Sequence, residues 1–326
     1  MRTILCLGRS LQGIFLALIL VLYSTTVTFA LPLRVSPSMP TQANSVPIHH
    51  IIYYYQTLRD LSPLIRNLNP ATGKPYPTDI NLGAFHLGPQ SDGTLIHLNS
   101  FPPNDPTFSI PWRQLAKLQS MGVALHMMLG GAACCSFQSL FGDWEHLYPV
   151  LKHTLQTYHF NGIDLDIEES VALQDVQRLI NQLSSDFGSR FEITLAPVAS
   201  DLSSGKGLSG FNYKDLYRTE GLKIAWFNTQ FYSGFGSLDS TSDYDSAINN
   251  GFPPSKVVAG MMGNSSDGDG YTDMSKVAQT IKLLTSKYPG FGGVFSWEYF
   301  NTLPGGTLHP ELWSKLMTQQ MQNDQI

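Results

Sequence analysis

Short apolar, β-rich runs recur along this chain at nearly regular intervals, and this repetition limits the folds that are open to it. Eight such runs follow one another at spacings of roughly 30 to 44 residues. They are HIIYYYQ near residue 50, INLGAFHLG near 80, VALHMMLGG near 123, NGIDLDIE near 161, FEITLAPVA near 191, IAWFNTQFY near 224, KVVAGMMG near 256 and GGVFSWEYF near 292.

Helix patterns stand between several of these runs. One pattern gathers apolar residues on a single face between Val176 and Phe187, and another does so between Val277 and Leu284. Strands that alternate with helices predict parallel βα units. Eight units within about 250 residues favour one α/β domain, a closed (β/α)8 (TIM) barrel over residues 49–326. An open doubly wound sheet is the alternative, but no G-x-G-x-x-G follows the first run.

The first 48 residues have a different character from the rest. Arg2 and Arg9 precede an apolar run over residues 14–23, and TTVTFA offers a small-residue cleavage site after Ala30. The run is shorter than the about 20 residues that a membrane span needs. We therefore predict a signal peptide over residues 1–30 and secretion to the extracellular space, with a signal anchor as the alternative. Residues 31–48 are rich in proline and read as a flexible leader or pro-segment.

Charge and cysteine content limit which partners and which disulfide bonds this protein can have. Loss of the predicted signal lowers Lys+Arg from 20 to 18 against 25 Asp+Glu, so the net charge moves from −5 to −7. This balance argues against a nucleic-acid partner and favours a neutral substrate. Beyond Cys6 the chain keeps only the neighbours Cys134 and Cys135, which cannot join distant segments. They form either a bond between neighbours or two free thiols.

The stretch FNGIDLDIEES, residues 160–170, places three acids at every second position. Asp164, Asp166 and Glu168 alternate with Ile163, Leu165 and Ile167, which is the period of a strand. In a parallel barrel the apolar set suits the helix-covered side, so the acids should face the lumen, with Glu168 at the carboxyl end of the strand. Burial and like charge would then raise at least one pKa and keep a proton available for general acid catalysis.

Two other interpretations of these acids remain. The first is a buried acid satisfied by hydrogen bonds alone. The second is a metal site, but calcium loops of related spacing are polar and turn-forming, whereas the interleaved residues here are apolar. No His or Cys cluster shows ligand spacing in the sequence. We therefore predict neither a metal nor a cofactor.

NGIDLDIE resembles the D-G-x-D-x-D-x-E signature of family 18 glycoside hydrolases, with Asn161 in place of the usual first Asp. LGG at residues 129–131, TQFY at 229–232 and GGVFSWEYFN at 292–301 follow in the order of that family, and the resemblance covers nearly all of residues 49–318. HLNSFPPNDPTF, LGGAACCSF and WEYFNTLPGGT look most like fungal secreted endo-β-N-acetylglucosaminidases. Met128 departs from the small serine often found before the glycines.

The resemblance implies a substrate-assisted mechanism, in which the N-acetyl group of the sugar is the nucleophile. Glu168 would protonate the leaving oxygen, Asp166 would orient the acetamide, Asp164 would share a proton with Asp166, and Tyr232 would hydrogen-bond the acetamide oxygen. Trp297 would form the apolar floor. Weaker candidates for the same pocket are Tyr54, Phe85 and Gln230, and ordinary barrel packing is the alternative for each aromatic residue.

The resemblance leaves more than one function open. The first is an endo-β-N-acetylglucosaminidase acting on the core of N-glycans, and the second is a chitinase acting on β-1,4-GlcNAc polymer. The third is an inactive lectin, which retention of Glu168 disfavours. We expect a monomer whose partner is a GlcNAc-containing oligosaccharide, with no membrane partner. The sequon NSS makes Asn264 a predicted glycosylation site.

Overall fold

The computed structural model describes residues 49–133, 135–205 and 207–322. The predicted signal peptide (1–30) and leader (31–48) therefore lie outside the described residues and remain predictions. Within the described residues, no helix combines the length and the apolar character that crossing a membrane would require.

Eight parallel strands close into a barrel, as predicted. Their order around the barrel is β1-β9-β8-β7-β6-β5-β4-β2, and the β1–β2 pairing closes the ring. The strands are β1 (His50–Tyr55), β2 (Asp79–Leu87), β4 (Ala124–Gly130), β5 (Gly162–Asp166), β6 (Glu192–Leu195), β7 (Ile224–Gln230), β8 (Val257–Met262) and β9 (Gly293–Trp297). A further short strand, β3 (Ile96–Leu98), pairs antiparallel with the end of β2 and was not predicted.

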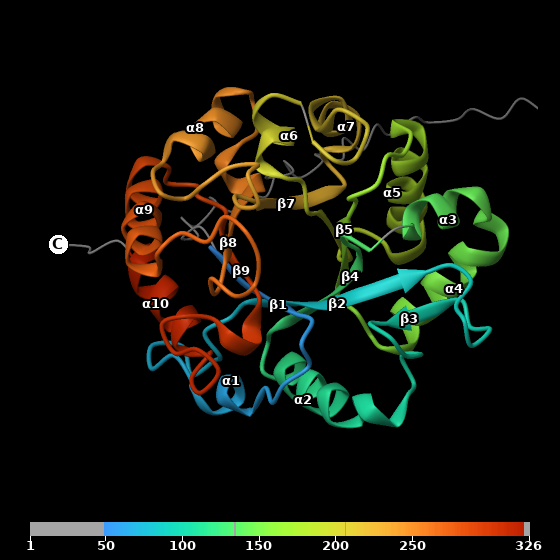
Figure 1. The fold of residues 1–326 in the computed structure, drawn as a ribbon, viewed down its shortest axis with the longest axis horizontal. Helices are drawn as coiled ribbons and strands as arrows, with labels where there is room; N and C mark the ends of the chain where they lie inside the picture. Colours follow the sequence, from blue (N-terminus) through green and yellow to red (C-terminus); the bar gives the residue numbers. More distant parts are fainter. Residues whose placement is uncertain (1–48, 134, 206, 323–326) are drawn as a thin grey trace, which may run out of the picture. The chain divides into compact units, whose positions relative to one another are not determined.

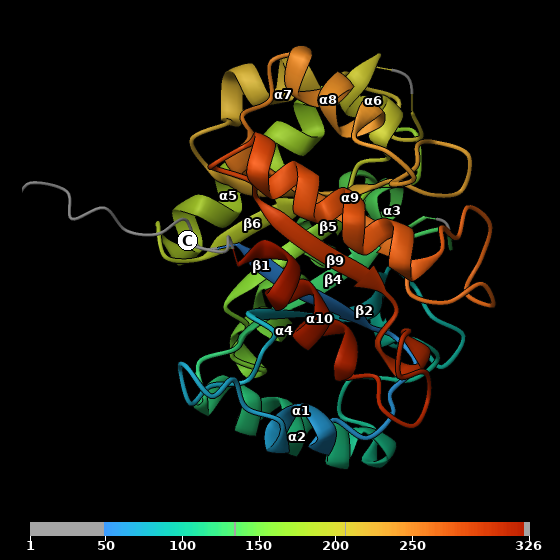
Figure 2. The ribbon, with the colours of Figure 1, turned by 90° about the vertical axis from the view of Figure 1, so that its left-hand side faces the viewer.

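Helices surround the strands (Figure 1). They are α1 (Ser62–Arg66), α2 (Ser109–Ser120), α3 (Ser136–Gly142), α4 (Trp144–Thr157), α5 (Leu173–Phe187), α6 (Ala199–Ser203), α7 (Tyr213–Glu220), α8 (Ser242–Asn249), α9 (Met274–Lys287) and α10 (Leu312–Met321). Short 3-10 turns occupy Pro106–Phe108, Pro254–Lys256 and Tyr299–Asn301. Figure 2 shows α9 and α10 in front of the strands, where α10 packs on both α9 and β1.

Local sequence explains where these helices begin, end and pack. The predicted apolar face of α5 is buried from Val176 to Leu183, and Gly188 ends the helix with a φ of 77°. The Asp273 side chain accepts a hydrogen bond from the Ser275 amide (2.9 Å) and caps the start of α9.

The strands separate an outer apolar core from a smaller cluster inside the barrel. Ile163, Leu165 and Ile167 are buried against the helices, as predicted. Asp164 and Asp166 point the other way and are also buried, at 0% and 4% exposure. The inner cluster around them contains Ile52, Tyr54, Ala84, Met128, Trp226, Tyr232, Val258, Met262 and Phe295.

Candidate active site

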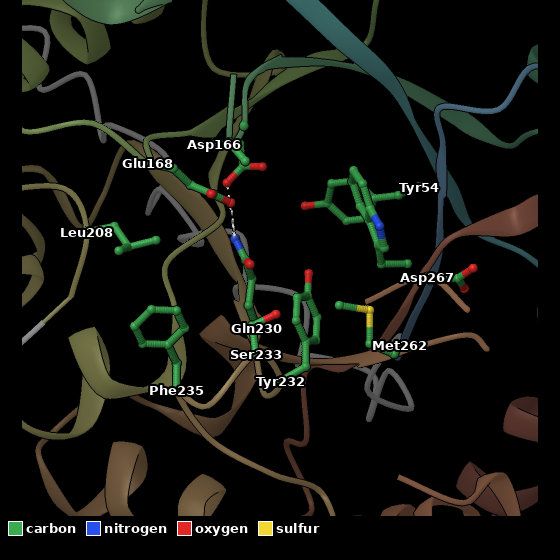
Figure 3. Close-up of a pocket in the computed structure, with 13 residues that line it drawn as sticks. Tyr54, Asp166, Glu168, Leu208, Gln230, Tyr232, Ser233, Phe235, Met262 and Asp267 are labelled. Atoms are coloured by element: carbon green, nitrogen blue, oxygen red, sulfur yellow. Dashed lines mark hydrogen bonds between the residues drawn. The ribbon is translucent and has the colours of Figure 1, made fainter. Parts of the chain in front are cut away.

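A cavity of about 270 Å³ lies at the carboxyl ends of the barrel strands. Asp166, Gln230, Met262 and Trp297 are the last residues of β5, β7, β8 and β9, and all four line it. The other lining residues are Tyr54, Gly131, Ala132, Glu168, Leu208, Tyr232, Ser233, Phe235 and Asp267 (Figure 3). Six of the predicted site residues therefore meet in one cavity.

Asp164 lies beneath this cavity and is held by three donors from three strands. Its carboxylate accepts hydrogen bonds from the Tyr54 hydroxyl, from Thr194 Oγ1 (2.6 Å) and from Asn228 Nδ2 (2.9 Å). Burial raises the pKa of Asp164, although these hydrogen bonds favour its ionised form and oppose the rise. The proton shared between Asp164 and Asp166 stays a prediction.

One side-chain amide, that of Gln230, contacts both Asp166 and Glu168. Gln230 Nε2 lies 3.1 Å from Asp166 Oδ1, 3.4 Å from Glu168 Oε1 and 2.9 Å from the Ala196 carbonyl oxygen (Figure 3). Glu168 lies two residues beyond the end of β5, at the mouth rather than within the strand. Its position at the carboxyl end of the barrel agrees with the prediction made from the alternating acids in the sequence.

The environment raises the pKa of both cavity carboxyls. Burial raises the pKa of Asp166 well above its usual value, and the negative charges of Glu168 and Asp164 raise it further. Burial also raises the pKa of Glu168, against the opposing hydrogen bond from Gln230. Two neighbouring carboxyls that cannot both ionise cheaply hold a proton to higher pH than an isolated carboxyl does, and general acid chemistry requires such a proton.

Aromatic side chains face this pair. Burial raises the pKa of Tyr232 well above its usual value, and the charges of Asp166 and Glu168 raise it further, so its phenol stays protonated and can donate a hydrogen bond. Tyr54 packs at 5.6 Å from Trp297 between ring centroids, and both line the cavity. The cavity therefore offers flat apolar faces beside proton donors, which suits a sugar ring with its hydroxyl groups.

Phe85 does not line the cavity, and this prediction needs correction. Its ring is fully buried in the outer core, where it packs edge to face on Phe160 with 5.8 Å between centroids. The pairing of β2 with β4 shifts register between Leu82 and Phe85. Because such an irregularity breaks the alternation of side chains, Ala84 joins the inner cluster and Phe85 turns outward.

The two departures from the family signature occupy supporting positions. Asn161 Oδ1 accepts hydrogen bonds from the Leu125 amide (2.9 Å) and from Gln119 Nε2 (3.0 Å), so it joins the starts of β5 and β4. Met128 belongs to the inner cluster, and its Cε lies 3.2 Å from where a Cβ on Gly131 would stand. Met128 therefore supports the cavity wall from below.

Thr194 and Asn228 donate hydrogen bonds to Asp164, but neither role was predicted from the sequence. The run IAWFNTQFY contained a signal for Asn228, because Trp226, Asn228 and Gln230 alternate and therefore share the inner face of β7. Thr194 carried no such signal, since a single threonine in an apolar strand is unremarkable.

A second polar cluster lies at the opposite, amino-terminal end of the barrel. Asp79 and Glu192 begin β2 and β6, and they lie close enough to His126 of β4 to hold a metal ion together. His126 Nε2 is 2.8 Å from Glu192 Oε2. Burial lowers the pKa of His126, but the hydrogen bond to Glu192 and the charges of Asp79 and Glu192 raise it overall. His126 is therefore hydrogen-bonded to one of the two carboxylates of this group, and the absence of a metal stays a prediction.

Two smaller predictions concern Asn264 and the cysteine pair. Asn264 Nδ2 donates to the Asn301 carbonyl oxygen (3.2 Å), and its glycosylation stays a prediction. Cys135 is disulfide-bonded, so it is not a free thiol, and Cys134 lies outside the described residues.

A (β/α)8 barrel with carboxyls of raised pKa and aromatic rings at the carboxyl ends of its strands has the architecture of a glycoside hydrolase. The comparisons agree with this class. A fungal endo-β-N-acetylglucosaminidase from glycosyl hydrolase family 18 is 42% identical, with a TM-score of 0.77 over 84% of this chain and 98% of that one. A chitinase from Aspergillus fumigatus is 36% identical, with a TM-score of 0.74 over 84% of this chain and 100% of that one.

The chain belongs to glycosyl hydrolase family 18. No family model matches its sequence. Among curated proteins, Chitinase 2 of Rhizopus oligosporus is 25% identical in an alignment 260 residues long, which covers 72% of this chain. The match covers 45% of that chitinase, so the present chain spans about half the length of this relative.

Proposed function

We propose that this protein is a secreted endo-β-N-acetylglucosaminidase that cleaves the β-1,4 bond between the two core GlcNAc residues of N-glycans. The observation that carries the proposal is that Asp166, Glu168, Tyr232 and Trp297 line one cavity. The likeness to the fungal endo-β-N-acetylglucosaminidase supports the choice of substrate. The predicted signal peptide supports secretion, and we expect the enzyme to act as a monomer without a cofactor.

Glu168 would be the proton donor. It stands at the cavity mouth with a raised pKa, so it can hold a proton and give it to the leaving glycosidic oxygen. Once ionised, the same carboxylate can take a proton from the water that completes hydrolysis. Gln230 would keep Glu168 directed toward Asp166 in both states.

The acetamide of the substrate would supply the nucleophile. Its carbonyl oxygen attacks the anomeric carbon as the glycosidic bond breaks, and water later opens the resulting oxazolinium ion with overall retention. Asp166 would accept the acetamide N–H and balance the positive charge, with Asp164 tuning it from below. The Tyr232 phenol would hydrogen-bond the acetamide oxygen. Because the nucleophile is tethered to the substrate, much of the rate would come from proximity.

Trp297 and Tyr54 would form the apolar wall against which the sugar ring packs. Both line the cavity, and Trp297 keeps part of its surface exposed. A ring held against a flat aromatic face loses little conformational freedom, which helps to present the acetamide in the reactive geometry.

The alternative is a chitinase, which the Aspergillus fumigatus and Rhizopus relatives favour. The same residues would cleave the same bond, so the substrates must be compared directly. The purified protein should be offered a high-mannose glycoprotein and a chitin oligomer in parallel. Deglycosylation without chitin cleavage supports the proposal. Chitin cleavage without deglycosylation replaces it with the alternative, and binding of either substrate without hydrolysis identifies a lectin.

Glu168→Gln should lower hydrolysis by about 100- to 10,000-fold, because it removes the proton donor while keeping the size of the side chain. Circular dichroism and oligosaccharide binding should remain close to those of the wild type. Glu169→Gln is the matched control, since Glu169 lies outside the cavity lining and accepts the Phe137 and Gln138 amides instead. Near wild-type turnover in Glu168→Gln would contradict the assignment.

A further inference from the structure

The polar group at the amino-terminal end of the barrel, Asp79, His126 and Glu192, does not line the catalytic cavity. Its members lie on β2, β4 and β6, so the closed sheet brings them together. One atom from each, a carboxylate oxygen or an imidazole nitrogen, lies within 4.8 Å of the other two. Among the residues that the structure describes, no other group of three His, Cys, Asp or Glu side chains is placed to hold a metal ion.

The strand between β4 and β6 leaves room for this group. Gly162 begins β5 and pairs in the sheet with both His126 and Glu192. A Cβ at Gly162 would overlap the Glu192 carbonyl oxygen and lie 2.5 Å from His126 Cδ2. Glycine at this position therefore lets the two side chains meet across β5, where His126 Nε2 lies 2.8 Å from Glu192 Oε2.

Two of the three side chains are oriented by partners outside the group. His126 Nδ1 lies 3.2 Å from Asn81 Oδ1, which leaves Nε2 as the nitrogen that faces the group. His50 Nδ1 lies 2.9 Å from Asp79 Oδ2, and the same oxygen accepts the Thr78 hydroxyl. Both of these bonds use Oδ2 and leave Asp79 Oδ1 for another partner. Histidines and carboxylates that bind metals are commonly fixed by hydrogen bonds of this kind.

Solvent reaches the group from one side. A cavity of about 480 Å³ lies at this end of the barrel, and His50, Asp79 and Glu192 are among the residues that line it. The Glu192 side chain is 39% exposed, whereas those of Asp79 and His126 are 4% and 0% exposed. Two possible ligands are therefore fixed inside the barrel, and the third can turn toward them from the cavity.

The donor atoms distinguish between classes of metal ion. Imidazole nitrogen suits Zn²⁺ and other transition metals, whereas Ca²⁺ and Mg²⁺ prefer oxygen ligands alone. Zn²⁺ binds nitrogen and oxygen at about 2.0 to 2.2 Å in a tetrahedral arrangement, which places neighbouring ligand atoms about 3.4 Å apart. The donor atoms of Asp79, His126 and Glu192 would have to shift by only about 1 Å to reach this spacing.

We propose that Asp79, His126 and Glu192 bind a Zn²⁺ ion at the amino-terminal end of the barrel. The ion would replace the proton between His126 Nε2 and Glu192 Oε2, and water from the cavity would complete its coordination. It would join β2, β4 and β6 and so stabilise the folded barrel. Such an ion would overturn the prediction of no metal, which was made from a sequence in which His126 and Glu192 stand 66 residues apart. Because the group does not line the catalytic cavity, the ion would bind whether or not the protein is a glycosidase.

Calorimetric titration of the metal-free, untagged protein with ZnCl₂ tests this site. The wild type should bind one Zn²⁺ per chain, and its unfolding temperature should rise with added zinc. Glu192→Gln should weaken binding about 10- to 100-fold and remove the rise, because the amide is a poor ligand without negative charge. The partly exposed position of Glu192 makes this variant the one expected to fold, which circular dichroism checks.

Asp92→Asn is the matched control. It breaks another pair of a histidine and a carboxylate, in which His97 Nε2 lies 2.9 Å from Asp92 Oδ2, outside the proposed site. This variant should bind zinc as the wild type does. No zinc binding by the wild type, unchanged affinity in Glu192→Gln, or equal weakening in Asp92→Asn would each overturn the site and leave a hydrogen-bonded cluster. Equal competition by Ca²⁺ would overturn the assignment of Zn²⁺.

Discussion

Gln230 shows how one side chain adjusts the chemistry of two others. Its amide contacts both Asp166 and Glu168, and these hydrogen bonds lower the pKa of each carboxyl against the larger effect of burial. An N–H donor stabilises a carboxylate more than a carboxylic acid, so Gln230 limits how strongly the pair retains its proton. The residue therefore helps to set the pH at which a proton donor is available.

Gln230→Leu should raise the pKa of the acid pair, because it removes a hydrogen bond that favours the ionised form. A general acid works in its protonated form, below its pKa, so the alkaline limb of the activity profile should move to higher pH. Measuring kcat/KM between pH 4 and 9 checks this shift. Gln177→Leu on the surface of α5 is the control. A limb that stays in place, or moves to lower pH, would show that Gln230 does not adjust the pair.

At the scale of neighbouring elements, a close contact between β4 and β5 positions Asp166. Gly130 ends β4 with a φ of 101°, and a Cβ there would overlap the Asp166 carbonyl oxygen and lie 2.6 Å from Phe137 Cε2. The next amide, that of Gly131, donates to the same carbonyl oxygen (2.9 Å). Only glycine allows this approach, and the backbone of Asp166 is fixed by it.

Gly130→Ala should therefore destabilise the protein by about 3 kcal/mol and lower activity, since it combines backbone strain with a clash at Asp166. Gly93→Ala is the matched control, because Gly93 also has a positive φ (83°) but nothing lies within 4 Å of an added Cβ. Its cost should be about 1 kcal/mol, from strain alone. Urea unfolding and kcat measure both effects. Equal costs for the two variants would show that the contact with β5 is unimportant.

In the whole molecule, buried acids make stability depend on pH. Burial raises the pKa of Asp201 to about 6 from 3.8. The folded protein therefore binds this proton more tightly than the unfolded chain does. The stability that the bound proton contributes is present below pH 3.8 and is lost as the pH rises through 6. Asp164, Asp166 and Glu168 act in the same direction, because the pKa of each is raised in the fold.

The free energy of unfolding should accordingly fall between pH 4.5 and pH 7.5. Asp201→Asn should flatten this fall by about 1 kcal/mol, because the amide binds no proton over this range. Denaturant unfolding at several pH values measures it, with Asp239→Asn at an exposed position as the control. If the free energy of unfolding of the wild type instead rises over this range, the buried acids do not control how stability depends on pH.

Much of this architecture was predictable from local patterns. The period of two in GIDLDIE correctly placed Asp164 and Asp166 inside the barrel and Ile163 and Leu165 outside it. The period of helical residues likewise predicted the buried face of α5. These patterns are readable because side-chain direction follows from the backbone of the element itself.

Other features depend on contacts that no local pattern contains. Gln230 is 64 residues from Asp166, and they meet because the barrel closes. The register shift in β2 turned Phe85 away from the site, and the segment that follows forms β3, which pairs with the end of β2. Local periodicity thus settled the strands, the helices and the inward row of acids. Tertiary closure decided which side chains hold those acids and which residues line the cavity, because both depend on distances between residues far apart in the chain.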